Sequence, residues 1–296
     1  MSTTVATRFV EKHARVLRHF VSTRGVEVCV LQASPLLGAY LGGVGVQGDD
    51  GRRLALLMLG SIALTAHAFV LNDWVGYARD ARDPRRPTIG ADGYGIGRNQ
   101  IGRLAVVLLL LAAVAFAAVG RSAMLFGAGI VTLSVLYSVS PTLGKGAPVA
   151  ASIHHLVGGA LHFLLGYTMV QAVDAKGAVL SLFFGLVFAA GHLNQEVRDY
   201  ELDRASGVRT SAVAFGCRHG FVASFCLFTT AYGLLVGLSA AGVLPKILLV
   251  SAVAWLVQAR WSLQALRRGL GFETALWMQR RYRLLFALIG LAMLAS

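Results

Sequence analysis

The sequence predicts an all-α polytopic membrane protein, with about nine transmembrane helices around a central cavity. Of its 296 residues, 56% are hydrophobic and only 14% are charged, and the mean hydropathy is +0.66. Soluble globular domains carry about 25% charged residues. A transmembrane β-barrel is excluded because its strands alternate apolar and polar positions, whereas runs such as 104–119 are apolar on every face.

The predicted helices follow from apolar stretches that approach the roughly 17–25 residues needed to cross a bilayer. These stretches lie at 27–46, 54–72, 104–120, 122–140, 149–172, 178–194, 221–242, 243–258 and 282–295. Tight turns are expected at Gly120-Arg121 and Gly242-Val243, where two pairs of spans nearly join. Gly38 and Gly42 have the spacing that lets helices approach closely. We expect residues 1–296 to form a single domain.

The net charge of +13 could suggest nucleic acid, but the distribution of the basic residues argues against it. Most of the 27 Lys and Arg residues lie before the first span and in alternate loops, at 79–103, 195–220 and 259–283. This asymmetry is typical of cytoplasmic loops. We therefore predict an integral protein of a bacterial-type inner (cytoplasmic) membrane, in contact with membrane lipid, with the N-terminus and the active site facing the cytoplasm and no nucleic-acid partner.

Two acidic clusters at the ends of apolar spans are the main functional signal, Asn72-Asp73 with Asp80 and Asp199 with Asp203. An ionisable side chain costs roughly 2.5–3.5 kcal/mol at the middle of a spanning helix, and less toward its ends. Such groups need a metal, a counter-charge or a polar ligand. Two clusters far apart in sequence therefore predict one shared site over a cytoplasm-facing cavity.

The second cluster predicts a polar stripe along one helix face. His192, Glu196, Asp199 and Asp203 follow steps of four, three and four residues. Carboxylates on such a stripe suit Mg²⁺, which takes one or two protein carboxylates and fills its other positions with water and phosphate oxygens. Glu196 and His192 lie about one and two turns deeper than Asp199, so they are candidates for orienting or deprotonating a second substrate.

A simpler interpretation of the same stretch needs no metal. Asp199 and Asp203 could pair with the neighbouring Arg198 and Arg204 at a solvated helix end. For His154, His155 and His162, on the predicted span 149–172, interhelical hydrogen bonding is the simpler interpretation.

The paired motifs resemble those of the UbiA superfamily of intramembrane prenyltransferases. Its first motif, Asn-Asp-x-x-Asp-x-x-x-Asp followed by Arg-Pro, is similar to Asn72-Asp73, Asp80 and Arg86-Pro87. Its second motif, Asp-x-x-x-Asp, is met by Asp199 and Asp203 within RDYELDRASGVRTSAVAFG. Tyr137-Ser138, before Lys145, also resembles the family's loop there. The chain departs from the pattern at Gly76, which replaces the middle aspartate of the first motif.

The resemblance implies a Mg²⁺-dependent transfer of an isoprenyl group from a polyprenyl diphosphate to a second substrate, an aromatic quinone precursor or a lipid headgroup. It implies a metal site and a diphosphate site. The metal ligands would be Asn72, Asp73, Asp80, Asp199 and Asp203, and the diphosphate ligands would be Arg86, Lys145, Arg209 and Tyr137. His192 and Glu196 would be the catalytic residues.

Two other functions fit the same residues. One is a terpene cyclase of the same superfamily, which would convert a prenyl diphosphate without a second substrate. The other is a non-catalytic carrier of lipids or small molecules, which Gly76 favours and the intact second motif opposes. The acceptor, the prenyl chain length and the oligomeric state stay open.

Overall fold

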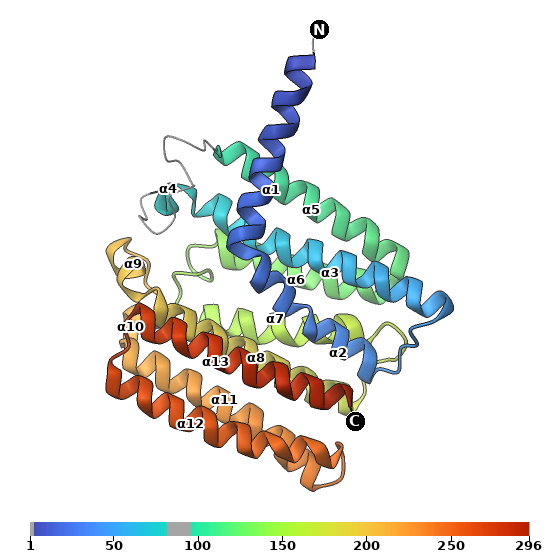
Figure 1. Ribbon diagram of the computed structural model, residues 1–296, viewed down its shortest axis with the longest axis vertical. Helices are drawn as coiled ribbons and strands as arrows, with labels where there is room; N and C mark the ends of the chain where they lie inside the picture. Colours follow the sequence, from blue (N-terminus) through green and yellow to red (C-terminus); the bar gives the residue numbers. More distant parts are fainter. Residues whose placement is uncertain (1–2, 82–95, 296) are drawn as a thin grey trace. The chain divides into compact units, whose positions relative to one another are not determined.

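The computed structural model describes residues 3–81 and 96–295, with side chains from residue 17 onward. Within these residues the chain is helical throughout its length (Figure 1), which confirms the predicted fold class. The helices are α1 (Thr3–Leu31), α2 (Ala33–Leu41), α3 (Gly48–Val75), α4 (Tyr77–Asp80), α5 (Arg98–Val119), α6 (Arg121–Val139), α7 (Ala150–Tyr167), α8 (Ala175–Arg198), α9 (Tyr200–Ala205), α10 (Ser211–Phe215), α11 (Cys217–Ala240), the 3-10 helix η1 (Lys246–Leu249), α12 (Val250–Arg268) and α13 (Phe272–Leu294).

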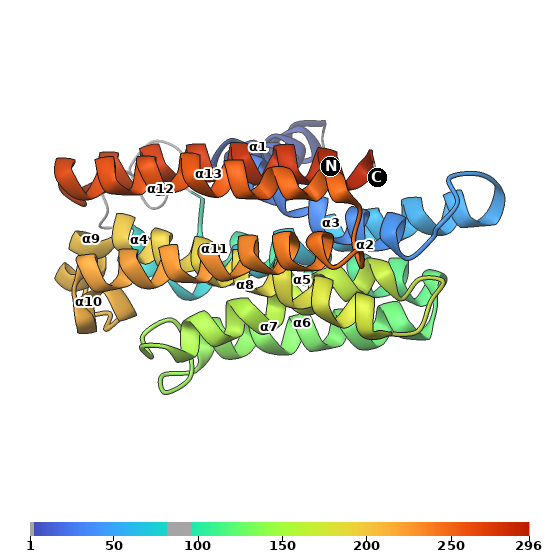
Figure 2. The same ribbon diagram turned by 90° about the horizontal axis from the view of Figure 1, so that it is seen from below.

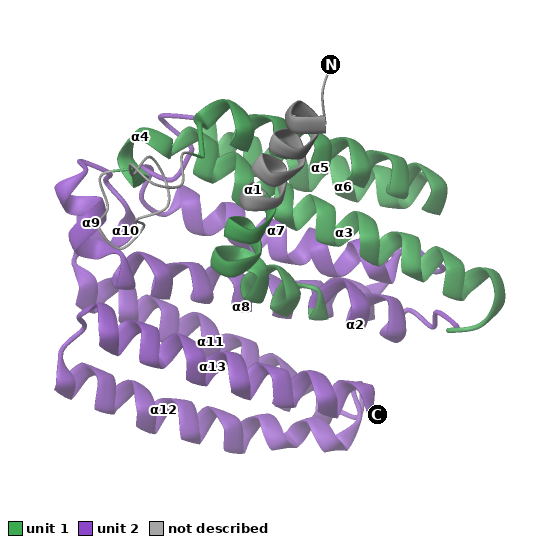
Figure 3. Ribbon diagram, turned by 45° about the horizontal axis from the view of Figure 1, so that its top comes forward, with its two compact units in different colours: residues 1–33, 46–139 green, residues 34–45, 140–296 purple. Residues whose placement is uncertain are grey.

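The chain forms two compact units, which Figure 3 distinguishes by colour. The first comprises residues 1–33 and 46–139, and the second comprises residues 34–45 and 140–296. In the first unit, α3 packs against α1, α5 and α6. Gly60 permits this packing, because a Cβ there would lie 2.6 Å from the ring of Phe116. His67 of α3 also bonds across to α5, through Nδ1 to the carbonyl oxygen of Ala105 at 2.8 Å.

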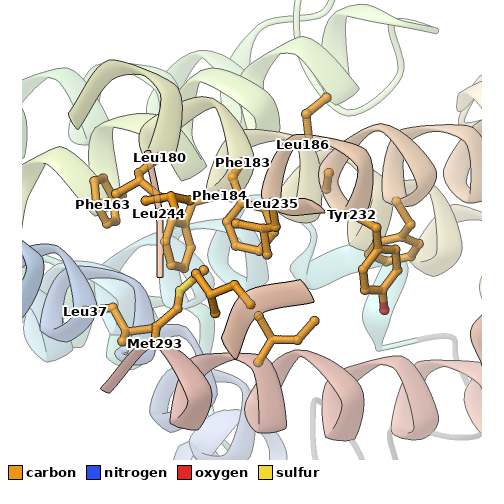
Figure 4. Close-up of a cluster of buried hydrophobic side chains, with 14 of the residues drawn as sticks. Leu37, Phe163, Leu180, Phe183, Phe184, Leu186, Tyr232, Leu235, Leu244 and Met293 are labelled. Atoms are coloured by element: carbon orange, nitrogen blue, oxygen red, sulfur yellow. The ribbon is translucent and has the colours of Figure 1, made fainter. Parts of the chain in front are cut away.

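In the second unit, α8, α11, α12 and α13 form a ring in which each helix contacts the next, and α7 packs against α8. Figure 2 shows α12 and α13 running side by side. The core of this unit is rich in aromatic rings, part of which Figure 4 shows. Phe163 of α7 stacks on Phe184 of α8 with 4.8 Å between ring centroids. Buried aromatic pairs of this kind add to the stabilisation that area burial provides.

Six of the described helices are long and apolar enough to cross a membrane, which makes nine an approximate number. They are α3, α5, α6, α8, α11 and the run from Lys246 to Arg268. The tight turn predicted at Gly120-Arg121 is confirmed, since Gly120 has a φ of 139° and separates α5 from α6. A positive φ of this size favours glycine.

The predicted bounds of three spans are wrong. Span 27–46 divides at Gln32 into the end of α1 and the start of α2. Proline has no backbone N–H, so Pro35 cannot donate to Leu31, and the helix breaks. Spans 243–258 and 282–295 belong to helices that continue to Arg268 and begin at Phe272. Their charged turns interrupt the apolar run without interrupting the helix.

Candidate functional site

The second acidic motif lies where α8 passes into the short helix α9. Asp199 forms the junction, with φ −93° and ψ 7°. Helical hydrogen bonds continue through it, because Asp199 N–H donates to Gln195 O and Asp203 N–H donates to Asp199 O, both at 2.9 Å. The side chain of Asp203 is only 1% exposed, whereas that of Asp199 is 22% exposed.

Both aspartates of this motif are ion-paired to basic side chains. Lys145 Nζ lies 3.0 Å from Asp203 Oδ1. Arg198 donates to both oxygens of Asp199, through Nε at 3.0 Å and Nη2 at 2.8 Å, and its Nη1 also donates to Gln279. The predicted pair between Asp199 and Arg198 is therefore present. Asp203 pairs instead with Lys145, a residue that the resemblance assigned to the diphosphate.

The loop that carries Lys145 is tied to helix α10. Val149 N–H donates to the hydroxyl oxygen of Ser211 at 3.1 Å. Thr210, the N-cap of α10, accepts from Val213 N–H. Val149 has a φ of 68°, which is unfavourable for a β-branched residue. The Ser211 bond helps hold this conformation and so keeps Lys145 beside Asp203.

A buried polar group lies deeper on α8, on the predicted stripe. His192 Nε2 and Glu196 Oε1 are 3.0 Å apart, with side chains 3% and 2% exposed. The other oxygen of Glu196 accepts from Ala212 N–H at 3.2 Å. The ring of His155, on α7, stacks on the ring of His192 with 3.7 Å between centroids and an interplanar angle of 8°.

His155 extends the polar group that the sequence had predicted. Its Nδ1 lies 2.8 Å from the carbonyl oxygen of Ala151, so Nδ1 carries a proton and donates it. The bond lies within α7, and the interhelical hydrogen bond predicted for His155 is wrong for this nitrogen. His154 likewise bonds within α7, to Ala150 O.

The first acidic motif lies at a similar junction in the first unit. Helix α3 ends at Val75, Gly76 donates its N–H to Asn72 O at 2.8 Å, and α4 continues to Asp80. Asp73 and Asp80 are 8% and 1% exposed. Arg24 of α1 pairs with Asp73, and Arg79 Nε lies 3.1 Å from Asp80 Oδ1.

The ion pair between Arg24 and Asp73 joins helices α1 and α3. Arg24 donates through Nη2 to Asp73 Oδ1 at 2.5 Å and through Nε to Oδ2 at 3.3 Å. Burial alone would lower the pKa of Arg24, but the Asp73 carboxylate raises it above its ordinary value. The guanidinium therefore stays charged, and its two-point contact fixes its orientation.

The other predicted ligands are distributed as follows. Asn72 and Tyr137 are half-buried, at the end of α3 and in α6. Arg209 is exposed between α9 and α10 and makes no hydrogen bond or ion pair with the described part of the chain. Arg86 lies outside the described residues, as does Pro87 of the same motif. A cavity shared by the two motifs stays a prediction.

The donor chemistry of the second motif suits a hard divalent cation. In residues 3–81 and 96–295, no group of three His, Cys, Asp or Glu side chains is arranged to hold a metal ion. Mg²⁺ does not require such a group, because it usually binds one or two carboxylates and completes its shell with water and phosphate. Asp199 and Asp203, four residues apart on a nearly continuous helix, are a donor pair of this kind.

Comparison of the sequence with known protein families identifies the family of this chain. Residues 33–293 match the UbiA prenyltransferase family. The chain belongs to this family. The family resemblance found in the two acidic motifs is thereby confirmed. Sequence comparison with curated proteins gives no match.

Solved structures of UbiA homologues share the fold. A homologue from Archaeoglobus fulgidus bound to GPP and Mg²⁺ has 17% identity and a TM-score of 0.71, over 96% of this chain and 100% of its own. A digeranylgeranylglyceryl phosphate synthase has 18% identity and a TM-score of 0.67, over 94% and 97%. The apo structure of a homologue from Aeropyrum pernix K1 has 16% identity and a TM-score of 0.69, over 90% and 96%.

Three residues of the site region were missed in the sequence. The sequence indicates Arg24 and Arg79 only as basic residues of the cytoplasmic side, and it predicts for His155 only a hydrogen bond between helices. Arg79 is next to Asp80 in the sequence, and this adjacency could have predicted their ion pair. Arg24 is 49 positions from Asp73, and only the packing of α1 on α3 brings the two together.

Proposed function

We propose that this UbiA family member is a Mg²⁺-dependent intramembrane prenyltransferase of a cytoplasmic membrane, with its active site facing the cytoplasm. It would move an isoprenyl group from a polyprenyl diphosphate to an aromatic quinone precursor or a lipid headgroup. The observation that carries the proposal is the second motif. Asp199 and Asp203 lie at a helix junction beside a basic side chain, Lys145, that is suited to a diphosphate.

The homologue from Archaeoglobus fulgidus supports the choice of substrate and metal, since it binds GPP and Mg²⁺. In this chain Asp199 and Asp203 would hold Mg²⁺, and the family resemblance adds Asn72, Asp73 and Asp80. When bound, the metal would supply positive charge to the diphosphate oxygens, where negative charge develops as the allylic C–O bond breaks.

The basic side chains around the second motif would share this task. Lys145 is 25% exposed and ion-paired through its ammonium group, which can turn toward a phosphate oxygen. Arg209 is exposed beyond α9 and offers a second cation, and the sequence-based proposal adds Arg86 and Tyr137. Donors placed where charge develops usually make the largest contribution to such a reaction.

The buried group on α8 would accept the proton that the second substrate loses. The allylic carbon loses the diphosphate, which leaves with the bonding electron pair, and forms a new bond to the nucleophilic atom of the acceptor. That atom then releases a proton. His192 and Glu196, which lie 3.0 Å apart and are buried, would take up this proton.

The test is to supply the purified protein in lipid nanodiscs with a prenyl diphosphate and Mg²⁺ and to analyse lipids and diphosphate release by mass spectrometry. Asp203→Asn should lose the product. The matched control is Glu201→Gln, which removes one charge from an exposed position of the same short helix and should retain it. A product formed equally by Asp203→Asn contradicts the proposal, and a hydrocarbon or terpene alcohol formed without acceptor identifies a cyclase.

A further inference from the structure

The centre of the first motif is filled by an arginine side chain. A Cβ built on Gly76 would lie 2.8 Å from Arg79 Nη2 and 3.3 Å from Asp80 Oδ2. Arg79 reaches this space while its Nε donates to Asp80 Oδ1 at 3.1 Å. The family pattern has a carboxylate at position 76. The missing side chain of Gly76 is therefore what gives the guanidinium room beside Asp80.

A second guanidinium occupies the other end of the motif. Arg24 holds both oxygens of Asp73 with its Nε and Nη2 groups, and its central carbon lies 5.4 Å from the ring centroid of Phe69. Stacking and a two-point bond together restrict the side chain to one orientation. Within the described residues, this arrangement leaves Nη1 of Arg24 available to another anion.

We propose that the first motif is an arginine-based diphosphate site that binds no Mg²⁺ of its own. Arg24 and Arg79 would neutralise Asp73 and Asp80 and donate hydrogen bonds directly to the phosphate oxygens. The inference rests on the proposed function. It also revises the expectation that Asn72, Asp73 and Asp80 are metal ligands, because the central acid is missing and a cation of the chain occupies its place.

The geometry of the guanidinium groups supports this exchange of a metal for arginine. A guanidinium presents its N–H groups as a rigid planar fork that matches carboxylate and phosphate oxygens, and it stays charged at all physiological pH values. The side chains of Arg24 and Arg79 are 21% and 22% exposed, so both are fixed by their carboxylates and still accessible to a ligand.

The second motif differs from the first at one of its two acids, Asp203. Both acids of its pattern are present. Arg198 holds both oxygens of Asp199, as Arg24 holds those of Asp73, but Asp203 is reached by a lysine, which contacts it through one oxygen. An ammonium on a flexible stem can move aside for a metal more easily than a stacked guanidinium bonded at two points. These contacts favour one metal ion at the second motif and, at the first motif, arginines in place of a metal.

Metal counting tests the inference. The protein in nanodiscs is saturated with a non-reactive prenyl bisphosphonate, and bound Mn²⁺ is counted by electron paramagnetic resonance. Wild type should bind one Mn²⁺ per chain. The double variant Gly76→Asp/Arg79→Ala, which restores the family carboxylate and removes the guanidinium, should bind two. Arg98→Ala, which removes an arginine stacked on Trp74 in the same unit, is the matched control and should bind one.

A second measurement covers the case in which the double variant does not fold. Without metal, Arg24→Gln should weaken bisphosphonate binding by about tenfold or more, the loss expected for a charged hydrogen bond. Two Mn²⁺ ions on wild type, one on the folded double variant, or unchanged binding by Arg24→Gln would overturn the inference. Two ions with normal turnover would leave the proposed function intact, whereas one ion without turnover would refute the function alone.

Discussion

Replacement of Gly166 by alanine should loosen the packing of α2 against α7 in the second unit. A Cβ at Gly166 would overlap the carbonyl oxygen of Pro35 and lie 2.7 Å from its carbonyl carbon and 2.8 Å from Ala39 N. Carbon atoms in contact are normally about 3.5–4.0 Å apart, so α2 would have to move by roughly 1 Å. All three neighbours are backbone atoms, which cannot rotate away.

The magnitude follows from two opposing contributions to the free energy of unfolding. Alanine is favoured over glycine inside a helix by about 1 kcal/mol. Overpacking costs typically about 1–3 kcal/mol, and a contact with rigid backbone belongs at the upper end. We expect Gly166→Ala to be destabilised by about 2 kcal/mol. Gly237→Ala is the control, since a Cβ there meets no atom within 4 Å, and it should be stabilised by up to about 1 kcal/mol.

The assay is thermal unfolding of the detergent-purified protein, followed by the loss of the monodisperse peak in size-exclusion chromatography. The order of stability should be Gly237→Ala, wild type, Gly166→Ala. A Gly166→Ala protein as stable as wild type would mean that α2 and α7 do not approach through backbone contacts. Equal destabilisation of both variants would show that alanine is disfavoured for another reason than packing.

Three other results are expected. Asp199→Asn should abolish Mg²⁺-dependent product formation while the protein still elutes as a folded peak, because it removes ligand charge without changing size; retained turnover would contradict the metal role. Glu196→Gln should slow turnover more than diphosphate binding, which a comparison of kcat with the bisphosphonate affinity measures. The Gly177 N–H bond and the Tyr167 hydroxyl lower the pKa of Asp174, the N-cap of α8. The ionised Asp174 therefore stabilises the protein above the ordinary Asp pKa, and this contribution is lost as the pH falls. Thermal unfolding should show wild type more stable than Asp174→Ala at neutral pH, and this difference should disappear at acid pH.

Most of the fold could be predicted because hydropathy reports directly on lipid contact. Runs such as those of α5 and α6 are apolar around the whole helix, and their separation at Gly120 needs a backbone that glycine adopts easily. Hydropathy does not predict the ends of helices that continue beyond the apolar layer. The last turn of α12 carries two arginines, and others lie in the first half of α13, where Arg281 is over the rings of Trp261 and Trp277.

The site could be predicted only in part, because motif spacing reports on one helix at a time. The stripe of His192, Glu196 and Asp203 follows from helical periodicity, and all three side chains are buried. The stacking of His155 on His192 depends on how α7 meets α8, which no spacing within either helix contains. Interhelical partners of this kind follow from packing between elements, through small residues such as Gly159 of α7 beside Phe188 of α8.

The charge pattern explains how one apolar chain keeps four aspartates at the ends of its helices. Arg79 and Arg198 are next in sequence to the acids that they contact, Asp80 and Asp199. These two ion pairs therefore need no packing between helices. The other two pairs join residues 49 and 58 positions apart, Arg24 with Asp73 and Lys145 with Asp203. Removing one partner of a buried ion pair leaves a costly unpaired charge. Each long-range cation is therefore both a structural counter-charge and a donor beside a candidate diphosphate site, so a substitution at Arg24 or Lys145 must be tested for folding and for ligand binding separately.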